Sequence, residues 1–304
     1  MRELTSLTDV IAAAGGDPVV VWAAQGMRGN VRAWMDGSAV AVASPALSRR
    51  DRLALFGEPT EVCPLVRNVL AEVGPTFRPL GDAELVLALP TMVPELVVAG
   101  EFGWMETRSA PPAGTDLTGR PRWLAAGATT DAEIQSLLDE ASPSSYARPD
   151  LPGVRRWAGM RTANGRLVSI AADAWSTPRV GALGATAGTG PGVGLIAGVA
   201  TAPDARGNGY GGSVCAMVVE DLVAEHGMAA LMVDTWNVAA IRMYQRLGLR
   251  WRSLAAARVS SQPATASATT QAAAGQAAAM VGSPRLVAPM VAAASTTSPH
   301  SSAR

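Results

Sequence analysis

Residues Gly194 to Gly212 read GLIAGVATAPDARGNGYGG and carry the strongest structural signal in the chain. An apolar, strand-like segment runs to Thr201, a glycine-rich turn follows, and an amphipathic helix then continues to His226 and Gly227. This order directs free backbone N–H groups and the positive end of the helix at one place, where glycine allows an anion to approach the backbone closely. The segment therefore predicts an anion-binding loop.

Two templates fit the glycines of this loop. One is G-x-G-x-x-G, filled by Gly207, Gly209 and Gly212. In a dinucleotide-binding fold an acidic residue follows about 20 residues later, and Asp234 occupies that place. The other template is R-x-x-G-x-G, filled by Arg206, Gly209 and Gly211. The dinucleotide interpretation is the weaker one, because Thr201 to Arg206, including a proline, intervene before the first glycine, which a dinucleotide-binding fold places directly after the strand.

The segment from Asn237 to Gly248, NVAAIRMYQRLG, favours the second template. Asn237 is a good helix N-cap, Gly248 is a typical helix terminator, and the apolar residues between them share one helical face. Together with the loop, the segment resembles the GCN5-related N-acetyltransferase (GNAT) superfamily, whose acetyl-CoA pyrophosphate loop is R-x-x-G-x-G and whose following helix is N-x-x-A-x-x-x-Y-x-x-x-G. The matching residues are Arg206, Gly209, Gly211, Asn237, Ala240, Tyr244 and Gly248. The resemblance covers residues 122–259, looks closest to the FR47-like branch, and implies an α/β (α+β) fold with a mixed central sheet flanked by helices.

The resemblance also assigns roles to residues. The strand before the loop is expected to splay from its neighbour, so that the exposed backbone of Val199, Ala200 and Thr201 pairs with pantetheine. The loop amides would hold the pyrophosphate, and they belong to Arg206, Gly207, Asn208, Gly209, Tyr210 and Gly211. Asn237 would contact the pantetheine arm, with helix capping as an equally good interpretation. Tyr244 would protonate the departing thiolate as a positioned hydrogen-bond donor, because a phenol is a weaker acid than a thiol.

The general base is less well defined. His226 lies at a helix end and His300 in the C-terminal tail, so neither is a good candidate. Asp173 and Asp234 are the candidate carboxylates, each with a solvated or capping aspartate as the alternative. The glutamate that some family members place near the splayed strand has no counterpart in Gly194 to Thr201, which leaves an ordered water as another possibility.

These features predict an acetyl-CoA-dependent N-acetyltransferase. Acetyl-CoA is the co-substrate, no metal is expected, and a primary amine of a small molecule or peptide attacks the thioester directly. The alternatives are a non-catalytic CoA-binding or sensory domain and a dinucleotide-binding module. No nucleic-acid or membrane partner is expected, and the expected location is the cytoplasm. The oligomeric state is left open, with a homodimer as one alternative.

The rest of the chain predicts two domains and a tail. Residues 1–107 are predicted to form an N-terminal α/β domain, which one interpretation takes as a degenerate copy of the same fold. The local signals in this region are the hairpin signal Asp36-Gly37, the strand-like run Val19 to Val21 and a helix over residues 60–73. The charge cluster Arg49 to Arg52 reads as a solvated face. A linker (108–121), the GNAT domain (122–259) with a hairpin at Asn164-Gly165, and a disordered tail (260–304) follow. The glycine-rich stretch Gly181 to Gly192 is expected to form a flap over the acceptor site.

Composition is typical of a globular protein. Of the 304 residues, 48% are hydrophobic and 16% are charged, which excludes a wholly disordered chain. The net charge is zero, yet seven arginines follow the last acidic residue, Asp234, so residues 235–304 carry +7 and residues 1–234 carry −7. Cys63 and Cys215 lack the spacing of a metal site or disulfide framework, and the N-terminus lacks the apolar core of a secretory signal. Both observations favour a reducing compartment without export.

Overall fold

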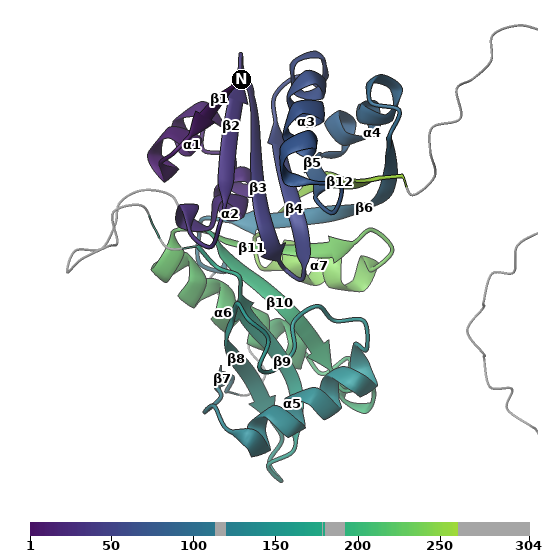
Figure 1. Ribbon diagram of the computed structural model, residues 1–304. Coiled ribbons are helices and arrows are strands. Elements are labelled where there is room, and N and C mark those ends of the chain that lie inside the picture. The colour runs from purple at the N-terminus through teal and green to yellow at the C-terminus, as the bar shows by residue number, and fades with distance from the viewer. Residues whose placement is uncertain (113–119, 178, 180–191, 261–304) are drawn as a thin grey trace, which may run out of the picture. The chain divides into compact units, whose positions relative to one another are not determined.

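The computed structural model describes residues 1–112, 120–177, 179 and 192–260 (Figure 1). The N-terminal elements are β1 (Arg2–Leu4), α1 (Leu7–Ala13), α2 (Pro18–Ala24), a 3-10 turn (Gln25–Met27), β2 (Arg32–Asp36), β3 (Ala39–Leu47), β4 (Arg50–Phe56), α3 (Pro59–Val73), β5 (Arg78–Asp82), α4 (Ala83–Met92) and β6 (Leu96–Thr107). The C-terminal elements are β7 (Arg122–Trp123), α5 (Ala128–Ala141), β8 (Val154–Arg161), β9 (Leu167–Ala174), β10 (Gly194–Thr201), a 3-10 turn (Pro203–Ala205), α6 (Tyr210–His226), β11 (Ala229–Asp234), α7 (Val238–Arg246) and β12 (Arg250–Val259). The predicted tail from residue 261 onward and the predicted flap at residues 181–191 lie outside the described residues.

The described strands form one mixed sheet. Its order is β1-β2-β3-β4-β5-β12-β6-β11-β10-β9-β8-β7. Within the described residues, β4 runs parallel to β5 and β10 runs parallel to β11, and the other neighbouring strands are antiparallel. This confirms the expected mixed sheet flanked by helices. It also argues against the dinucleotide interpretation, which requires a mostly parallel, doubly wound sheet.

The two halves repeat one order of elements but exchange their last strands. In each half, antiparallel strands lead to a parallel pair joined by a helix, α3 between β4 and β5 or α6 between β10 and β11, and another helix and strand follow. However, β6 pairs with β11, and β12 pairs with β5. β6 and β12 also pair with each other from Leu96↔Val259 to Glu106↔Arg250. The repeat supports the interpretation of the N-terminal half as a degenerate copy of the same fold.

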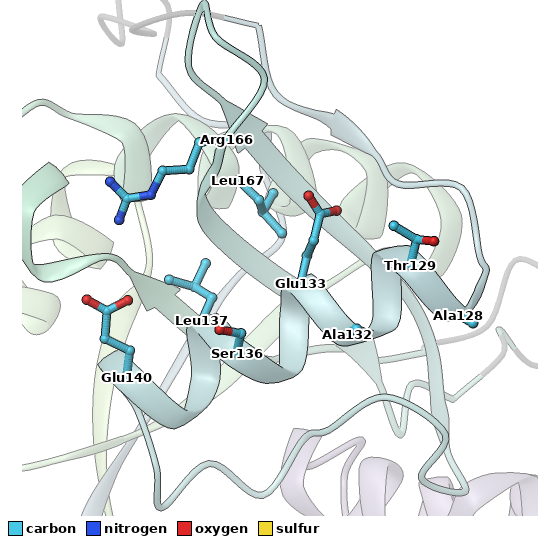
Figure 2. A pocket seen from close by; sticks show the side chains of 9 residues that line it. All are labelled: Ala128, Thr129, Ala132, Glu133, Ser136, Leu137, Glu140, Arg166 and Leu167. Carbon is cyan, nitrogen blue, oxygen red and sulfur yellow. The ribbon is translucent and has the colours of Figure 1, made fainter.

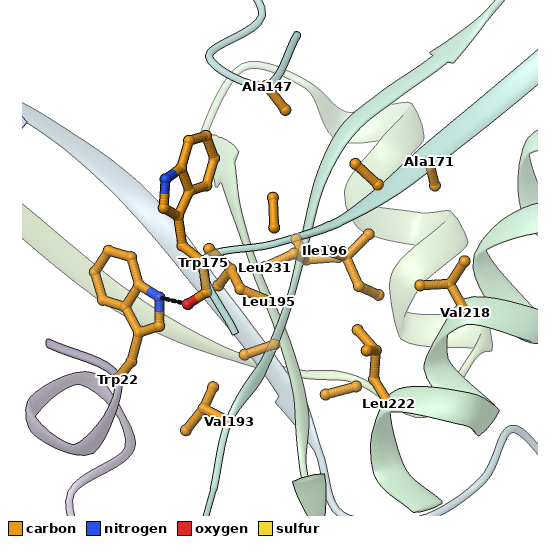
Figure 3. Packing of buried hydrophobic residues seen from close by; sticks show 14 of the residues in the cluster. Trp22, Ala147, Ala171, Trp175, Val193, Leu195, Ile196, Val218, Leu222 and Leu231 are labelled. Carbon is orange, nitrogen blue, oxygen red and sulfur yellow. Dashed lines mark hydrogen bonds between the residues drawn. The ribbon is translucent and has the colours of Figure 1, made fainter. Parts of the chain in front are cut away.

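Both faces of the sheet are covered. In β3, Val40 and Val42 pack in the core shared with α2, whereas Ala39 and Ala41 pack in the core beneath α3 and α4. In the C-terminal half, α6 packs against β8 to β11 and α5 packs against β9 and β10. The two halves also meet where Trp22 Nε1 of α2 donates a hydrogen bond of 3.0 Å to the Trp175 carbonyl after β9 (Figure 3).

Local sequence signals mostly gave the correct elements. The hairpins at Asp36-Gly37 and Asn164-Gly165 are β2–β3 and β8–β9, and the predicted helix over 60–73 is α3. The run Val19 to Val21 was wrongly assigned to a strand, because it lies in α2. There Asp17 Oδ1 accepts from the amides of Val19 and Val20 at 2.9 and 3.0 Å, and Pro18 occupies the first helical turn. An N-cap and burial therefore outweigh the β preference of valine.

Candidate active site

The strands β10 and β11 separate partway along their length. They pair over Gly194 to Ile196, after which β10 continues beside β9 and β11 beside β6. A bulge between Ala197 and Ala200 accompanies the separation, and Gly198 has a φ of +60° there. A Cβ at Gly198 would also lie 2.6 Å from the Trp157 ring, so glycine is required on both counts. The expected splay is present.

The backbone of β10 faces the resulting gap at alternate residues. Ala202 N–H donates to the Val168 carbonyl of β9 at 2.9 Å, and the Ala200 carbonyl accepts from Ser169 Oγ at 3.2 Å. Because backbone groups alternate between the two edges of a strand, Val199 and Thr201 face the gap. Of the three residues predicted to pair with pantetheine, Val199 and Thr201 are therefore better placed than Ala200.

The glycine-rich loop leads into an uncapped helix. Gly207 and Gly209 have φ values of +82° and +77°, and no side chain caps the N-terminus of α6. A Cβ at Gly211 would lie 3.0 Å from Thr201 Oγ1, so the helix start lies close against the end of β10. The Asn208 side chain donates to the Ala205 carbonyl at 3.1 Å and thereby fixes the turn. The loop thus presents backbone amides at a helix N-terminus, as an anion site requires.

The Arg206 side chain contributes to the loop in a different way. Its Nε donates to the Thr201 carbonyl at 3.3 Å, and its Nη2 donates to the Ala141 carbonyl at 3.4 Å. The guanidinium therefore ties the loop to β10 and to the end of α5. Its predicted role at the pyrophosphate depends on the backbone amide.

Helix α7 places Asn237 and Tyr244 near the loop. Asn237 Oδ1 accepts from the Ala240 amide at 3.2 Å, so the capping interpretation is confirmed, and the predicted contact with pantetheine stays a prediction. Tyr244 is 5% exposed. Burial, with a smaller effect of Cys215, raises the pKa of the Tyr244 phenol well above its usual value. The phenol therefore keeps its proton at neutral pH, which suits a hydrogen-bond donor.

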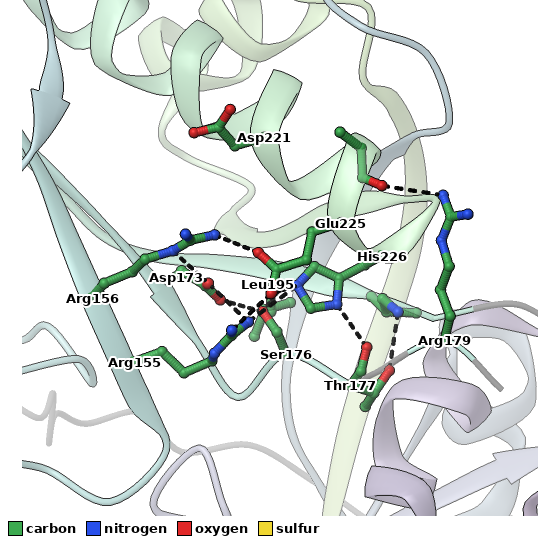
Figure 4. Close-up of polar contacts among 12 residues, drawn as sticks. Arg155, Arg156, Asp173, Ser176, Thr177, Arg179, Leu195, Asp221, Glu225 and His226 are labelled. Atoms are coloured by element: carbon green, nitrogen blue, oxygen red, sulfur yellow. Dashed lines mark hydrogen bonds and ion pairs between the residues drawn. The ribbon is translucent and has the colours of Figure 1, made fainter. Parts of the chain in front are cut away.

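Asp173 belongs to an ion-pair network between β8, β9 and α6 (Figure 4). Its carboxylate is fully buried and accepts from Arg155 Nη1 at 3.2 Å and from Arg156 Nε at 3.1 Å. Glu225 binds the same two guanidinium groups at 2.7 and 2.6 Å. The ligand atoms of Asp173, Glu225 and His226 lie within 4.8 Å of one another, but the arginines already occupy both carboxylates. The cluster is therefore read as an ion-pair network, and the expected lack of a metal stays a prediction.

Burial, with a smaller effect of Arg155, favours the neutral form of His226. His226 Nδ1 lies 2.8 Å from the Thr177 carbonyl, which can only accept, so Nδ1 carries the proton. Nε2 is then free to accept from Arg155 Nη1 at 3.3 Å. A proton on Nε2 would face that guanidinium. Burial lowers the pKa of His226, although the Thr177 bond and the carboxylates of Glu225 and Asp173 oppose the shift.

Asp234 lies elsewhere, in a cavity that opens beside the splay. The cavity volume is ≈ 440 Å³, and its lining includes Ala197 to Val199 of β10 and Met232 to Asp234 of β11. Asp234 is exposed at the end of β11. Of the two predicted carboxylates, Asp234 therefore lines the cavity, whereas Asp173 is engaged in the network behind β9.

The N-terminal half forms another wall of this cavity. Arg50, Arg52 and Arg78 of this half line it, and Tyr146, from the loop after α5 of the C-terminal half, lines it as well. The interpretation of Arg49 to Arg52 as a solvated face is wrong for Arg52, which is only 6% exposed. The alternation of arginine with other residues in a β-strand could have signalled this, because Arg50 and Arg52 then point to the same face of the sheet.

A separate hollow of ≈ 720 Å³ lies between α5 and the start of β9 (Figure 2). Glu133 and Glu140 of α5 and Arg166 before β9 line it. It contains none of the predicted site residues. Arg166 and Glu133 are also paired elsewhere, with Asp204 and Arg161. We therefore place the functional site at the splay.

Comparisons with known proteins agree with this fold. Residues 132–249 match the family model of the acetyltransferase (GNAT) family. A GCN5-related N-acetyltransferase from Kribbella flavida superposes with a TM-score of 0.51 at 18% identity, covering 82% of this chain and 94% of that one. A GCN5-related N-acetyltransferase-like protein from Streptococcus suis has a TM-score of 0.48 at 11% identity, and the match covers 83% of this chain and 97% of that one. A GCN5-related N-acetyltransferase from Sphaerobacter thermophilus has a TM-score of 0.45 at 17% identity, and the match covers 72% of this chain and 79% of that one. No curated protein matches the chain at a significant level.

The mixed sheet, the splayed strand and the glycine loop before α6 define the C-terminal half as a mixed α/β domain of the kind found in GNAT proteins. Residues 132–249 are similar in sequence to the GNAT acetyltransferase family. The family match supports an acyltransferase. No helix within the described ranges has both the length and the apolar character needed to cross a membrane.

Proposed function

We propose that the protein is an acetyl-CoA-dependent N-acetyltransferase that acts on a primary amine of a small molecule or peptide. One observation carries the proposal: the splayed end of β10 meets the uncapped N-terminus of α6 and opens into a cavity that contains Asp234. The finer assignments to the FR47-like branch and to the cytoplasm remain predictions from the sequence.

The residues present fit acetyl-CoA at two points. The amides from Arg206 to Gly211 precede a helix without a side-chain cap, which suits a pyrophosphate. The backbone of Val199 and Thr201 faces a gap that no strand fills within the described residues, which suits the amide groups of pantetheine. When bound, acetyl-CoA supplies a thioester carbonyl near the bulge, where backbone N–H groups of β10 can stabilise the developing negative charge.

The proposed reaction is a direct acyl transfer. The amine first loses a proton, for which Asp234 is the base we propose, either directly or through a water. Its nitrogen then attacks the thioester carbon, so that the C–N bond forms and the C–S bond breaks with its electron pair on sulfur. Tyr244 donates a hydrogen bond and a proton to this sulfur, and the second proton that the nitrogen loses restores the neutral phenol. The products are an amide, the free thiol and one released proton.

Asp234 is preferred over Asp173 as the base for a structural reason. Asp234 lies in the cavity, whereas Asp173 is fully buried and accepts from two arginines. A carboxylate that is held by two guanidinium groups is a poor proton acceptor. The role of Asp173 in this proposal is therefore to position β8 and β9 against α6.

The proposed binding of acetyl-CoA is tested by calorimetry. Gly209→Asp places a carboxylate at the N-terminus of α6, so we expect acetyl-CoA binding to be lost. Gly165→Asp is the matched control, because Gly165 has a similar φ of +87° in the distant β8–β9 hairpin. Equal affinity in both folded variants would reject the site. Tight NAD binding without acetyl-CoA binding would favour the dinucleotide alternative.

The proposed catalytic activity is tested by measuring thiol release from acetyl-CoA with a panel of amines. The proposal expects amine-dependent release and a marked loss of kcat in Asp234→Asn. If acetyl-CoA binds but no amine is turned over, the non-catalytic CoA-binding or sensory interpretation takes its place.

A further inference from the structure

The cavity beside Asp234 has a cationic side. Arg50 and Arg52 lie two residues apart on β4, and Arg52 is directly opposite Arg78 of β5 in the parallel pair. Residues two apart in a strand point to the same face of the sheet. All three arginines line the cavity, so three guanidinium groups gather on one of its walls.

These arginines lack an acidic partner. Among the residues that the structure describes, none of the three forms a salt bridge. The Nε atoms of Arg50 and Arg52 are buried and have no hydrogen-bond partner there. Arg50 as a whole is half-buried, and its guanidinium group lies 5.8 Å from the centroid of the Tyr146 ring and lowers the pKa of that phenol through a hydrogen bond. Arg52 is 6% exposed, so it is the buried charge of the three. A buried, unpaired charge is costly, so proteins retain one mainly where a ligand completes it.

The charge of Arg52 persists at neutral pH despite this environment. Burial lowers the pKa of Arg52 to about 10, with Tyr146 opposing the shift and the charges of Arg50 and Arg78 reinforcing it. The guanidinium thus stays protonated but poorly solvated. An anion in the cavity would restore the interactions that burial removes.

The opposite side of the cavity is acidic. Glu101 of β6 and Asp234 of β11 line it, and Asp234 pairs with Phe102, next to Glu101. Only β12 lies between β5 and β6, so these two strands are roughly 10 Å apart, whereas β4 and β11 each lie one strand further out and are about 19 Å apart across the sheet. Long arginine side chains shorten these gaps, and Arg78 is the arginine nearest to the acidic strands. The cavity therefore complements a ligand that carries an ammonium group and an anionic group at its two ends.

We propose that the acceptor amine also carries an anionic oxygen group, a carboxylate or a phosphate, which Arg50, Arg52 and Arg78 bind while the amine lies beside Asp234. Amino acids, and peptides through their C-terminal carboxylate, belong to this class of acceptor. The inference rests on the proposed function, since it names the acceptor class of the same site.

The first experiment compares acceptors that differ only in the anionic group. We would measure kcat/KM from thiol release with amino acids and their amides, and with 2-aminoethyl phosphate and ethanolamine. The anionic member of each pair should react on the order of tenfold faster, and the preferred pair separates carboxylate from phosphate recognition. Equal or faster turnover of the neutral members would overturn the inference and leave the proposed function intact.

Variants assign the effect to the arginines. Arg78→Gln should raise KM for the anionic acceptor on the order of tenfold, and should raise it more than KM for the matched neutral amine. Arg28→Gln is the matched control, because Arg28 is exposed and outside the cavity. An unchanged preference in Arg78→Gln and in Arg50→Gln would overturn the inference.

A binding measurement keeps the inference testable if no amine reacts. Titration of the full chain with N-acetylated amino acids and their amides should show binding of the acids only, and Arg52→Met should abolish it. Because Arg52→Met also removes a buried unpaired charge, its Tm should rise. Acid binding that persists in Arg52→Met, or no binding of any acid to the unmodified protein, would refute the arginine site.

Discussion

At Tyr244, burial and proposed chemistry act on the same hydroxyl group. The ring packs with the core of the C-terminal half, and burial keeps the phenol protonated. The sequence motif predicted this residue because a tyrosine seven positions after a capping asparagine is typical of the family helix. In contrast, Arg52 was not predicted as a cavity residue, because its place in a cluster of charged residues indicated a solvated face.

Tyr244→Phe tests whether the hydroxyl protonates the leaving group. The substitution keeps the apolar ring, so we expect kcat to fall on the order of 10² or more, with little change in Tm or in acetyl-CoA affinity. The measurements are steady-state kinetics with chemistry as the slow step, calorimetry and thermal melting. An unchanged kcat would leave the proton to water. An unchanged kcat with a lower Tm would instead identify a structural hydrogen bond.

At the scale of elements, short-range signals were the most reliable. The two Asx-Gly hairpins, the α6 C-cap at Gly227 and the Asn237 cap of α7 all depend on a few neighbouring residues. The position of β6 and β12 at the centre of the sheet was not predicted, because strand order depends on pairing between distant segments. The ion-pair network of Asp173 was missed for the same reason: its partners come from β8 and α6.

That network predicts how stability depends on pH. The folded pKa of His226 lies below its ordinary value of 6.5, so as pH falls below about 6.5 the unfolded chain binds a proton that the folded chain does not. The free energy of unfolding should therefore decrease between pH 7 and about 5. Glu225, whose folded pKa is also lowered, should add a loss of stability at lower pH, below about 4.5.

Thermal melting from pH 7 to 5 checks this dependence. His226→Asn should flatten the change in Tm across that window, because asparagine does not titrate. His300→Asn is the control, since His300 is the other of the two histidines in the chain and lies outside the described residues. A Tm that is the same at pH 7 and pH 5.5 in the unmodified protein would contradict the argument.

At the scale of the whole molecule, the two halves share an order of elements but contribute different parts of the proposed site. In the C-terminal half, glycines lead into α6. In the N-terminal half, the corresponding helix α3 begins after Glu58 and has Glu61 in its first turn, where a carboxylate opposes the binding of an anion. The N-terminal half therefore lacks an anion loop at this position and supplies the arginine wall of the cavity instead.

The exchange of β6 and β12 couples the folding of the halves. Each half needs a strand of the other to complete its side of the sheet, so unfolding one half exposes the edge of its neighbour. We therefore expect residues 1–264, which form one compact unit, to unfold in a single cooperative transition.

Two matched core substitutions test this coupling. Val40→Ala lies in the N-terminal half and Val218→Ala in the C-terminal half, and both valines are fully buried. Each should reduce the free energy of unfolding by about 1–3 kcal/mol and shift the whole transition, as followed by circular dichroism and by loss of acetyl-CoA binding. Two separate transitions, with each substitution moving only one of them, would show that the halves unfold independently despite their exchanged strands. If both probes instead shift together, then Val40→Ala, which lies in the other half, lowers the temperature at which acetyl-CoA binding is lost because the two halves unfold together.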